Sequence, residues 1–352
     1  MSTARVVPSA PVRRVALVRP RFLGDVCLTL PALDAVRAAC PEARVAYVVE
    51  RDGAPLLEGD PRIDELIVVP RPLTPATNLR VIAELRRFAP QVVFDFFCNP
   101  RTALWAWTSG ARVRVGYPDK GWRSALYTHH ARPRTLSAVD FHLASLTAVG
   151  WPAPTRTPRL VIADRARAEA REALRELGVA DDGPLLGLHP GARWMTRRWM
   201  PARFAALGKR FLAAERRGTV LVTGGPDDEA LAHEVADELP RERARVVTGW
   251  PIARFIALQS LCTAFVCGDT GPLHTAVAAG TPTLGLMSRN RPAMFFPYPE
   301  SAGHRAYYAR AECSPCHRDE CDDLRCLTRL TTEGAWERLE DMLARRPSGP
   351  AR

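Results

Sequence analysis

The chain has 352 residues, of which 47% are hydrophobic and 25% are charged, a globular composition with enough apolar material for two cores. Met1 to Arg14 lack the continuous apolar run of a signal peptide, and no stretch has the length of a membrane-spanning helix, so we expect a cytoplasmic protein. The net charge of +11 favours an anionic partner; a genomic bias toward arginine would explain the choice of cation but not its excess over acids.

In the first half, short β-branched segments alternate with helical patterns, which predicts a parallel sheet covered by helices. The expected strands are Val15–Val18, Val45–Val49, Leu66–Val69, Val92–Phe96 and Arg112–Gly116. The expected helices are Leu28–Ala39 and Leu79–Phe88. The fold class is therefore α/β.

The second half repeats this alternation of short β-branched segments and helical patterns. Its expected strands are Leu185–His189, Val220–Thr223, Arg245–Val247, Ala264–Cys267 and Thr283–Met287. Its expected helices are Ala202–Ala214, Asp228–Leu239, Ile252–Leu261, Pro272–Ala279 and Thr332–Ala344. We predict a first domain over residues 1–165, a linker over 166–183 and a second domain over 184–331. Residues 332–352 form a final helix and tail, and the helix is expected to pack back on the first domain.

Asp25 follows the first expected strand and Gly24, directly before an apolar helix. In open α/β sheets, ligands bind at the carboxyl ends of strands. Asp25 is therefore a candidate general base for an acceptor hydroxyl. The alternative is that its carboxylate only caps the helix.

Three segments of the second half also follow strand ends and are candidates for holding a phosphorylated donor. Backbone N–H groups at helix N-termini bind phosphate, arginine pairs with it bidentately, and carboxylates accept from ribose or sugar hydroxyls. The candidate donor residues are His189, Gly191, Thr196, Arg197, Arg198, Gly225, Asp227, Asp228, Asp269, Thr270, Gly271 and His274. Simple helix capping by the aspartates and solvation of the arginine pair are the alternatives.

A basic and aromatic stretch in the first half, which includes Trp122, suits an anionic acceptor. The candidate acceptor residues are Arg21, Arg101, Arg114, Lys120 and Arg123. Solvated surface charge is the alternative.

Taken in order along the chain, these segments resemble glycosyltransferase family 9, the lipopolysaccharide heptosyltransferases, closer to the heptosyltransferase II-like members. The segments that carry the resemblance are Val15–Arg19, Leu23–Val26, Leu30–Leu33, His189–Ala192, Thr196–Trp199, Thr223–Pro226, Gly268–His274, Gly280–Thr283 and Cys313–Cys316. The family has lysine where this chain has Arg197, which changes a point charge into a planar fork.

The resemblance implies a GT-B fold, in which two Rossmann-like domains have parallel sheets facing across a cleft. It implies inverting transfer of heptose from ADP-L-glycero-D-manno-heptose to the lipopolysaccharide inner core, with Asp25 as the base. It places Arg197, Thr270 and Gly271 near the diphosphate and Asp269 near the donor. The implied partners are ADP-heptose and an anionic lipopolysaccharide acceptor at the inner-membrane surface, with the enzyme cytoplasmic or peripheral on the inner face of that membrane.

We expect no required cofactor and no catalytic metal, because the sequence contains no Asp-x-Asp pair. Four clustered cysteines, Cys313, Cys316, Cys321 and Cys326, either hold a structural zinc ion or form a reduced cluster that packs a loop. The five remaining cysteines lie in apolar surroundings and are expected to be free thiols.

Three other functions stay open from the sequence alone. One is a family member that uses another nucleotide sugar for core or O-chain synthesis, and another is a sugar-nucleotide epimerase with the same architecture. The third is a protein that binds without catalysis. We expect no nucleic-acid partner, because no nucleic-acid-binding module is recognisable.

Overall fold

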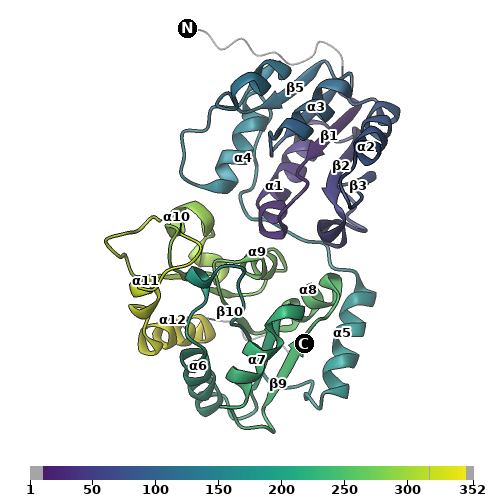
Figure 1. Ribbon diagram of the computed structural model, residues 1–352. Helices are drawn as coiled ribbons and strands as arrows, with labels where there is room; N and C mark the ends of the chain where they lie inside the picture. Colours follow the sequence, from purple (N-terminus) through teal and green to yellow (C-terminus); the bar gives the residue numbers. More distant parts are fainter. Residues whose placement is uncertain (1–10, 317, 346–352) are drawn as a thin grey trace. The chain divides into compact units, whose positions relative to one another are not determined.

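The computed structural model describes residues 11–316 and 318–345, so the expectations for the N-terminal ten residues and for the tail after Arg345 lie outside the described residues. The chain divides into two compact units between Val161 and Ile162 (Figure 1). Each unit contains one six-stranded sheet in which all paired strands are parallel. The predicted α/β class with two Rossmann-like units is confirmed.

The first sheet has the order β3-β2-β1-β4-β5-β6. Its strands are β1 (Arg14–Val18), β2 (Arg44–Glu50), β3 (Glu65–Val69), β4 (Val92–Asp95), β5 (Val113–Gly116) and β6 (His129–His130). Its helices are α1 (Leu23–Ala39), α2 (Pro75–Phe88), α3 (Pro100–Thr108) and α4 (Ala138–Thr147). β1 is buried at four of five positions, the pattern of a strand covered on both faces.

The second sheet has the order β12-β11-β10-β7-β8-β9. Its strands are β7 (Leu185–His189), β8 (Thr219–Gly224), β9 (Ala244–Thr248), β10 (Ala264–Gly268), β11 (Thr283–Met287) and β12 (Arg305–Tyr308). Its helices are α5 (Asp164–Glu176), α6 (Pro201–Ala214), α7 (Glu229–Ala236), α8 (Ile252–Leu261), α9 (Gly271–Ala278), α10 (Pro292–Phe295), α11 (Arg325–Thr328) and α12 (Thr332–Ala344).

Counted from its own first strand, each sheet has the strand order 3-2-1-4-5-6. In such a sheet the chain leaves neighbouring central strands in opposite directions, and the loops there part to form a ligand site. In the first unit this switch point lies between β1 and β4, where Val18 pairs with Asp95. In the second unit it lies between β7 and β10, where His189 pairs with Cys267.

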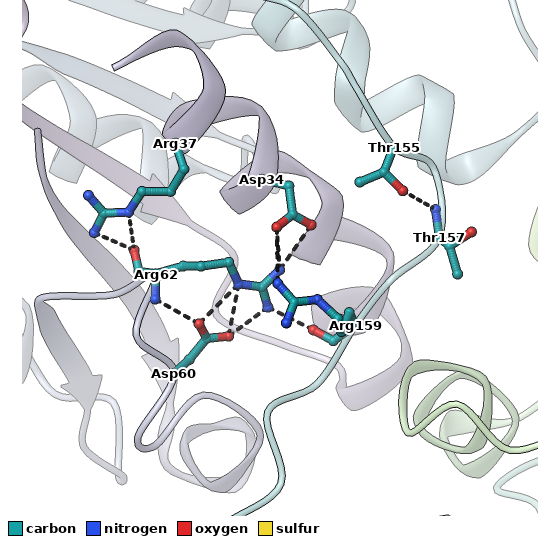
Figure 2. A network of polar contacts seen from close by, with 7 residues as sticks. All are labelled: Asp34, Arg37, Asp60, Arg62, Thr155, Thr157 and Arg159. Carbon is teal, nitrogen blue, oxygen red and sulfur yellow. Dashed lines mark hydrogen bonds and ion pairs between the residues drawn. The ribbon is translucent and has the colours of Figure 1, made fainter. Parts of the chain in front are cut away.

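The boundary between the units differs from the expected linker over 166–183. The segment before Val161 is tied to the first unit by Arg62, which ion-pairs with Asp60 and Asp34 and donates to the carbonyl oxygen of Arg159 (Figure 2). Helix α5 packs against α8 and so belongs to the second unit. The charged residues of this segment form the exposed face of this amphipathic helix.

The final helix, which we expected to pack back on the first domain, makes contacts within the second unit. α12 packs against α6 and β12, and Ala335, Leu339 and Met342 lie in the hydrophobic core of the second unit. Their spacing of three to four residues gives the helix one apolar face, which completes that core. Within the described residues, none of the helices combines the length and apolarity needed to cross a bilayer.

Candidate functional site

Arg197 and Asp269 meet at the switch point of the second sheet. Nη1 of Arg197 donates to the backbone oxygen of Asp269 at 2.6 Å and lies 3.6 Å from its carboxylate. Asp269 is 2% exposed, and its Oδ2 accepts from Nδ2 of Asn290 at 2.5 Å. The Arg197 guanidinium also stacks over Trp194, with 4.6 Å to the ring centroid. These contacts fix a cation and a carboxylate side by side at the end of β10.

Gly268 allows this approach. A Cβ atom on Gly268 would lie 2.4 Å from the backbone oxygen of Arg197, so only glycine fits between the two segments. The next residue but one, Thr270, is the N-cap of α9 in extended conformation and makes no side-chain cap. The N–H groups of Thr270 and Gly271 therefore stand at a helix N-terminus, where amides lack carbonyl partners within the helix and favour an anion.

The loops after β7 and β8 meet at Asp228. Its Oδ2 accepts from the N–H of Gly225 at 3.3 Å, and a Cβ on Gly191 would lie 2.3 Å from the same oxygen. Asp228 therefore holds the backbone of this turn, although its side chain makes no capping bond to α7, of which it is the N-cap residue. Arg198 donates from Nε to the oxygen of Ala192 at 2.7 Å and lies 3.9 Å from Asp228. The neighbouring Asp227 is exposed.

Three other candidate donor residues are engaged inside the fold. Nδ1 of His189 lies 2.9 Å from Oγ1 of Thr223, and burial lowers the pKa of His189 to about 4, so its imidazole is neutral at neutral pH. Nδ1 of His274 lies 2.7 Å from the hydroxyl of Tyr298. The hydroxyl of Thr196 donates to the oxygen of Arg318 at 3.0 Å. These contacts give the three side chains roles in shaping the loops.

In the first unit, Asp25 lies in the first turn of α1, whose N-cap is Phe22, so Asp25 is not the capping residue. Nη2 of Arg19 lies 2.8 Å from Oδ1 of Asp25, and Nη1 of Arg19 donates to the oxygen of Phe96 at 2.8 Å. Arg19 is buried, whereas 30% of the Asp25 side chain is exposed. The carboxylate is therefore held from the protein side and reachable by a hydroxyl group.

The candidate acceptor residues differ in their surroundings. Arg114 holds the fold together, since it donates from Nε to the oxygen of Leu126 at 2.8 Å and from Nη1 to that of Ala111 at 2.6 Å. The exposed Arg21 lies over Phe22 and Phe97, close to the Asp25 edge. The other three, all half-buried, are Arg101 on α3, Lys120, and Arg123 in the 3-10 turn η2 (Gly121–Leu126).

The chain matches a protein-family model over residues 79–326, which is more than half of its length, and that family is described as glycosyltransferase family 9 (heptosyltransferase). The chain belongs to this family. The family predicted from the motifs is thereby confirmed, and the protein is a glycosyltransferase.

Three similar proteins align with almost the whole length of this glycosyltransferase. Lipopolysaccharide heptosyltransferase 1 of Pseudomonas aeruginosa is 28% identical over 361 residues, covering 94% of this chain and 98% of that protein. The crystal structure of a family 9 glycosyl transferase from Veillonella parvula superposes with a TM-score of 0.81 at 23% identity, covering 96% and 99% of the two chains. E. coli ADP-heptose lps heptosyltransferase II superposes with a TM-score of 0.77 at 19% identity, covering 94% and 98%. These structural likenesses confirm the GT-B fold.

Sequence reasoning missed four residues around the two switch points of this glycosyltransferase. Arg19, Trp194 and Asn290 make the contacts with Asp25, Arg197 and Asp269 given above. The fourth is Asp95 at the end of β4, a buried carboxyl whose pKa is raised by burial and whose Oδ2 accepts from Tyr127 at 2.7 Å. Position at a strand end is the signal that would have found Arg19, Asp95 and Asn290.

The cysteine cluster has no metal-site geometry in the described part of the chain, where no group of three or more His, Cys, Asp or Glu side chains is arranged to hold an ion. Burial, and then the nearby Cys313, Cys316 and Cys321, raise the pKa of the Cys326 thiol. All nine cysteines are free thiols. Cys321 donates to the oxygen of Asp323, and Cys326 is buried in the second core.

Proposed function

We propose that this glycosyltransferase transfers a heptose from ADP-L-glycero-D-manno-heptose to the lipopolysaccharide inner core, with inversion and without a metal ion. The observation that carries the proposal is the Arg197–Asp269 pair at the second switch point, beside the N-terminus of α9. The named heptosyltransferases among the similar proteins, one of them described by its donor ADP-heptose, support the choice of sugar.

The second unit would bind the donor. Arg197 and Arg198 would pair with the diphosphate, together with the N–H groups of Thr270 and Gly271. The Oδ1 atom of Asp269 would accept from a donor hydroxyl while Oδ2 is occupied by Asn290. Because these groups are held in place before the donor arrives, they need little reorganisation as negative charge grows on the diphosphate.

The first unit would supply the base. Asp25 would take the proton of the acceptor hydroxyl while the hydroxyl oxygen forms a bond to C1 of the sugar. The bond from C1 to the diphosphate oxygen breaks on the opposite face, and its electron pair leaves with ADP. Attack from that face inverts the anomeric centre. Two arginines would provide the positive charge for the leaving group, and the sequence has no Asp-x-Asp pair for a metal clamp.

The acceptor would be an anionic saccharide carried on a lipid at the inner face of the inner membrane. Arg21, Arg101, Lys120 and Arg123 would contact its phosphates and carboxylates. These cations lie in the unit that holds Asp25, so one unit would position both the acceptor and the base. The hydrogen bonds of Arg114 to backbone oxygens would give it a supporting role for the same loops.

A donor screen tests the proposal. The thermal midpoint of unfolding is measured with a panel of ADP-, UDP- and GDP-sugars, because a ligand that binds the native state raises this midpoint with its concentration. We expect the largest rise with ADP-heptose, and the same rise in the Asp25→Asn variant, since Asp25 does not hold the donor. Stabilisation by a UDP- or GDP-sugar without any by ADP-heptose would overturn the donor assignment in favour of another nucleotide sugar.

A further inference from the structure

Residues 97–136 of the first unit hold a large share of the positive charge of the chain. They contain seven Lys and Arg against one acid, Asp119, and so contribute six of the eleven excess charges. The seven are Arg101, Arg112, Arg114, Lys120, Arg123, Arg132 and Arg134. Among the described residues no ion pair involves any of these seven, although the structure forms many elsewhere. Apart from Arg114, whose guanidinium donates to two backbone oxygens of the same unit, these cations are available to an outside partner.

Five of the seven cations, all but Arg112 and Arg114, lie in segments that follow the ends of three neighbouring strands. Helix α3 follows β4, the turn η2 follows β5, and residues 131–136 follow β6. Because these strands are parallel neighbours, the three segments leave the sheet at the same edge. Arg19 and Asp25 follow β1 at this edge too. η2 also packs against α3, which brings their side chains together.

Large apolar side chains stand exposed among these cations. Trp122 on η2 is 69% exposed, Trp107 on α3 53%, Leu104 on α3 40% and Leu136 57%. Arg101, Leu104 and Trp107 recur every three residues, so they follow one face of α3. We call Arg101, Leu104, Trp107, Trp122, Arg132, Arg134 and Leu136 the basic–aromatic surface.

We propose that the basic–aromatic surface docks this protein on an anionic phospholipid bilayer. Tryptophan is enriched at the headgroup level, where its ring is apolar and its N–H is solvated, and aliphatic side chains gain by entering the acyl boundary. Each cation near an anionic leaflet strengthens binding about five-fold. A bilayer satisfies both kinds of side chain, whereas a free phosphorylated saccharide gives Leu104 and Leu136 nothing apolar to contact. The proposal rests on the proposed function, in which the acceptor is carried by such a membrane.

Vesicle co-sedimentation tests the docking without donor or acceptor. The full chain is mixed with phosphatidylcholine vesicles that contain or lack phosphatidylglycerol, and its partition constant is measured at low and high salt. The variants are R132S/R134S, L136S and W122S. The matched controls are R216S/R241S, which removes two exposed cations from the second unit, and L177S, which removes an exposed leucine there. Thermal unfolding verifies that each variant is folded.

We expect the wild-type chain to prefer the anionic vesicles and to bind less at high salt. R132S/R134S should lower the partition constant about 25-fold, and R216S/R241S should change it less than about two-fold. L136S and W122S should weaken binding more than L177S. Equal binding to both vesicle types, or equal losses in the variant and control pairs, would overturn the proposal. Release of bound protein by a delipidated, phosphorylated core saccharide would show a saccharide site in its place.

Transfer to that delipidated saccharide separates the two proposals. R132S/R134S and L136S should transfer heptose to it at the wild-type rate, because none of these residues is assigned to the base, the donor or the acceptor. Normal transfer by a chain that does not bind vesicles would refute the docking proposal and leave the proposed function standing. Vesicle binding by a chain that transfers no heptose would instead refute the proposed function and leave the docking proposal standing.

Discussion

The guanidinium of Arg19 lies 2.8 Å from Oδ1 of Asp25 and donates at the same time to the carbonyl oxygen of Phe96, also at 2.8 Å. One buried side chain thus links the first turn of α1 to the residue after β4, across the switch point of the first sheet. The planar fork of arginine makes both contacts in a fixed geometry, which an ammonium group does not reproduce. Arg19 is therefore a positioning residue for the proposed base.

Replacement of Arg19 by methionine should lower kcat about 100-fold, because the carboxylate of Asp25 loses the contact that orients it. The donor KM should stay within a few-fold, since the residues proposed to bind the donor are on the second unit. Arg19→Lys should recover part of kcat. Steady-state kinetics of both variants provide the measurement. An unchanged kcat in Arg19→Met, in protein that unfolds at the wild-type temperature, would leave Arg19 with a structural role only.

Replacement of Arg197 by alanine should weaken ADP binding about 10- to 100-fold, because a charge-assisted contact with the diphosphate is lost. Transfer should fall by at least as much. Calorimetric titration with ADP measures the affinity, and Arg216→Ala, an exposed arginine of the same unit, is the control. Unchanged ADP affinity in Arg197→Ala would count against a diphosphate role.

Gly268→Ala should lower the free energy of unfolding by about 1–3 kcal/mol, because the new Cβ would lie 2.4 Å from the backbone oxygen of Arg197. Gly225→Ala is the matched comparison for stability. Its Cβ would meet nothing closer than Asp228 Oδ2 at 3.5 Å, and its φ of −68° suits alanine. Denaturant unfolding should therefore separate the two variants. Equal stabilities would show that the segments at Gly268 are not in close contact.

Buried histidines should make stability depend on pH between about 4 and 6.5. Burial lowers the pKa of His304 and that of His189 to about 4, while an unfolded histidine takes up a proton near 6.5. In this window the unfolded state binds more protons, so stability falls as the pH falls, by up to about 1.4 kcal/mol per pH unit for each histidine. Above pH 6.5 this contribution does not change.

His304→Asn should reduce that slope, and the same substitution at the exposed His233 should leave it unchanged. The free energy of unfolding, measured from pH 4.5 to 7, gives the slopes. Because the substitution also alters packing, the slope is the relevant quantity and the absolute stability is not. Identical slopes in wild type and His304→Asn would show that His304 takes up its proton over the same pH range in the folded and the unfolded chain.

Much of the fold was predictable because local patterns agree with tertiary structure. Four elements begin and end where the sequence predicted, namely β7, α8, β11 and α12, each of which has a clear apolar period or a turn at its ends. Strands β6 and β12 were missed because both are short and lie at sheet edges, where fewer positions are buried. Helix α1 begins five residues before the expected Leu28, because its N-cap Phe22 provides no polar capping signal.

The candidate site was predictable in its strand-end positions and less so in its side-chain contacts. The order of strands and helices along the chain placed Asp269, Arg197 and Asp25 after the carboxyl ends of strands, where parallel sheets bind ligands. The partners of these residues depend on packing between distant segments. Arg19 reaches Phe96, 77 residues away, and Thr196 reaches Arg318, 122 residues away. No local pattern encodes such contacts, so Thr196 and His274 were assigned to the donor although their side chains bond within the fold.

The most direct test of the account is heptose transfer by wild type and by Asp25→Asn, measured with ADP-heptose and a truncated lipopolysaccharide acceptor. Asp164→Asn, which makes the same change in the first turn of another helix, is the control. We predict that Asp25→Asn loses about 100- to 10,000-fold in kcat, the range for a general base, while its donor affinity stays within a few-fold. The control should transfer at the wild-type rate. Near-normal turnover by Asp25→Asn, or no transfer by the wild type, would contradict the account.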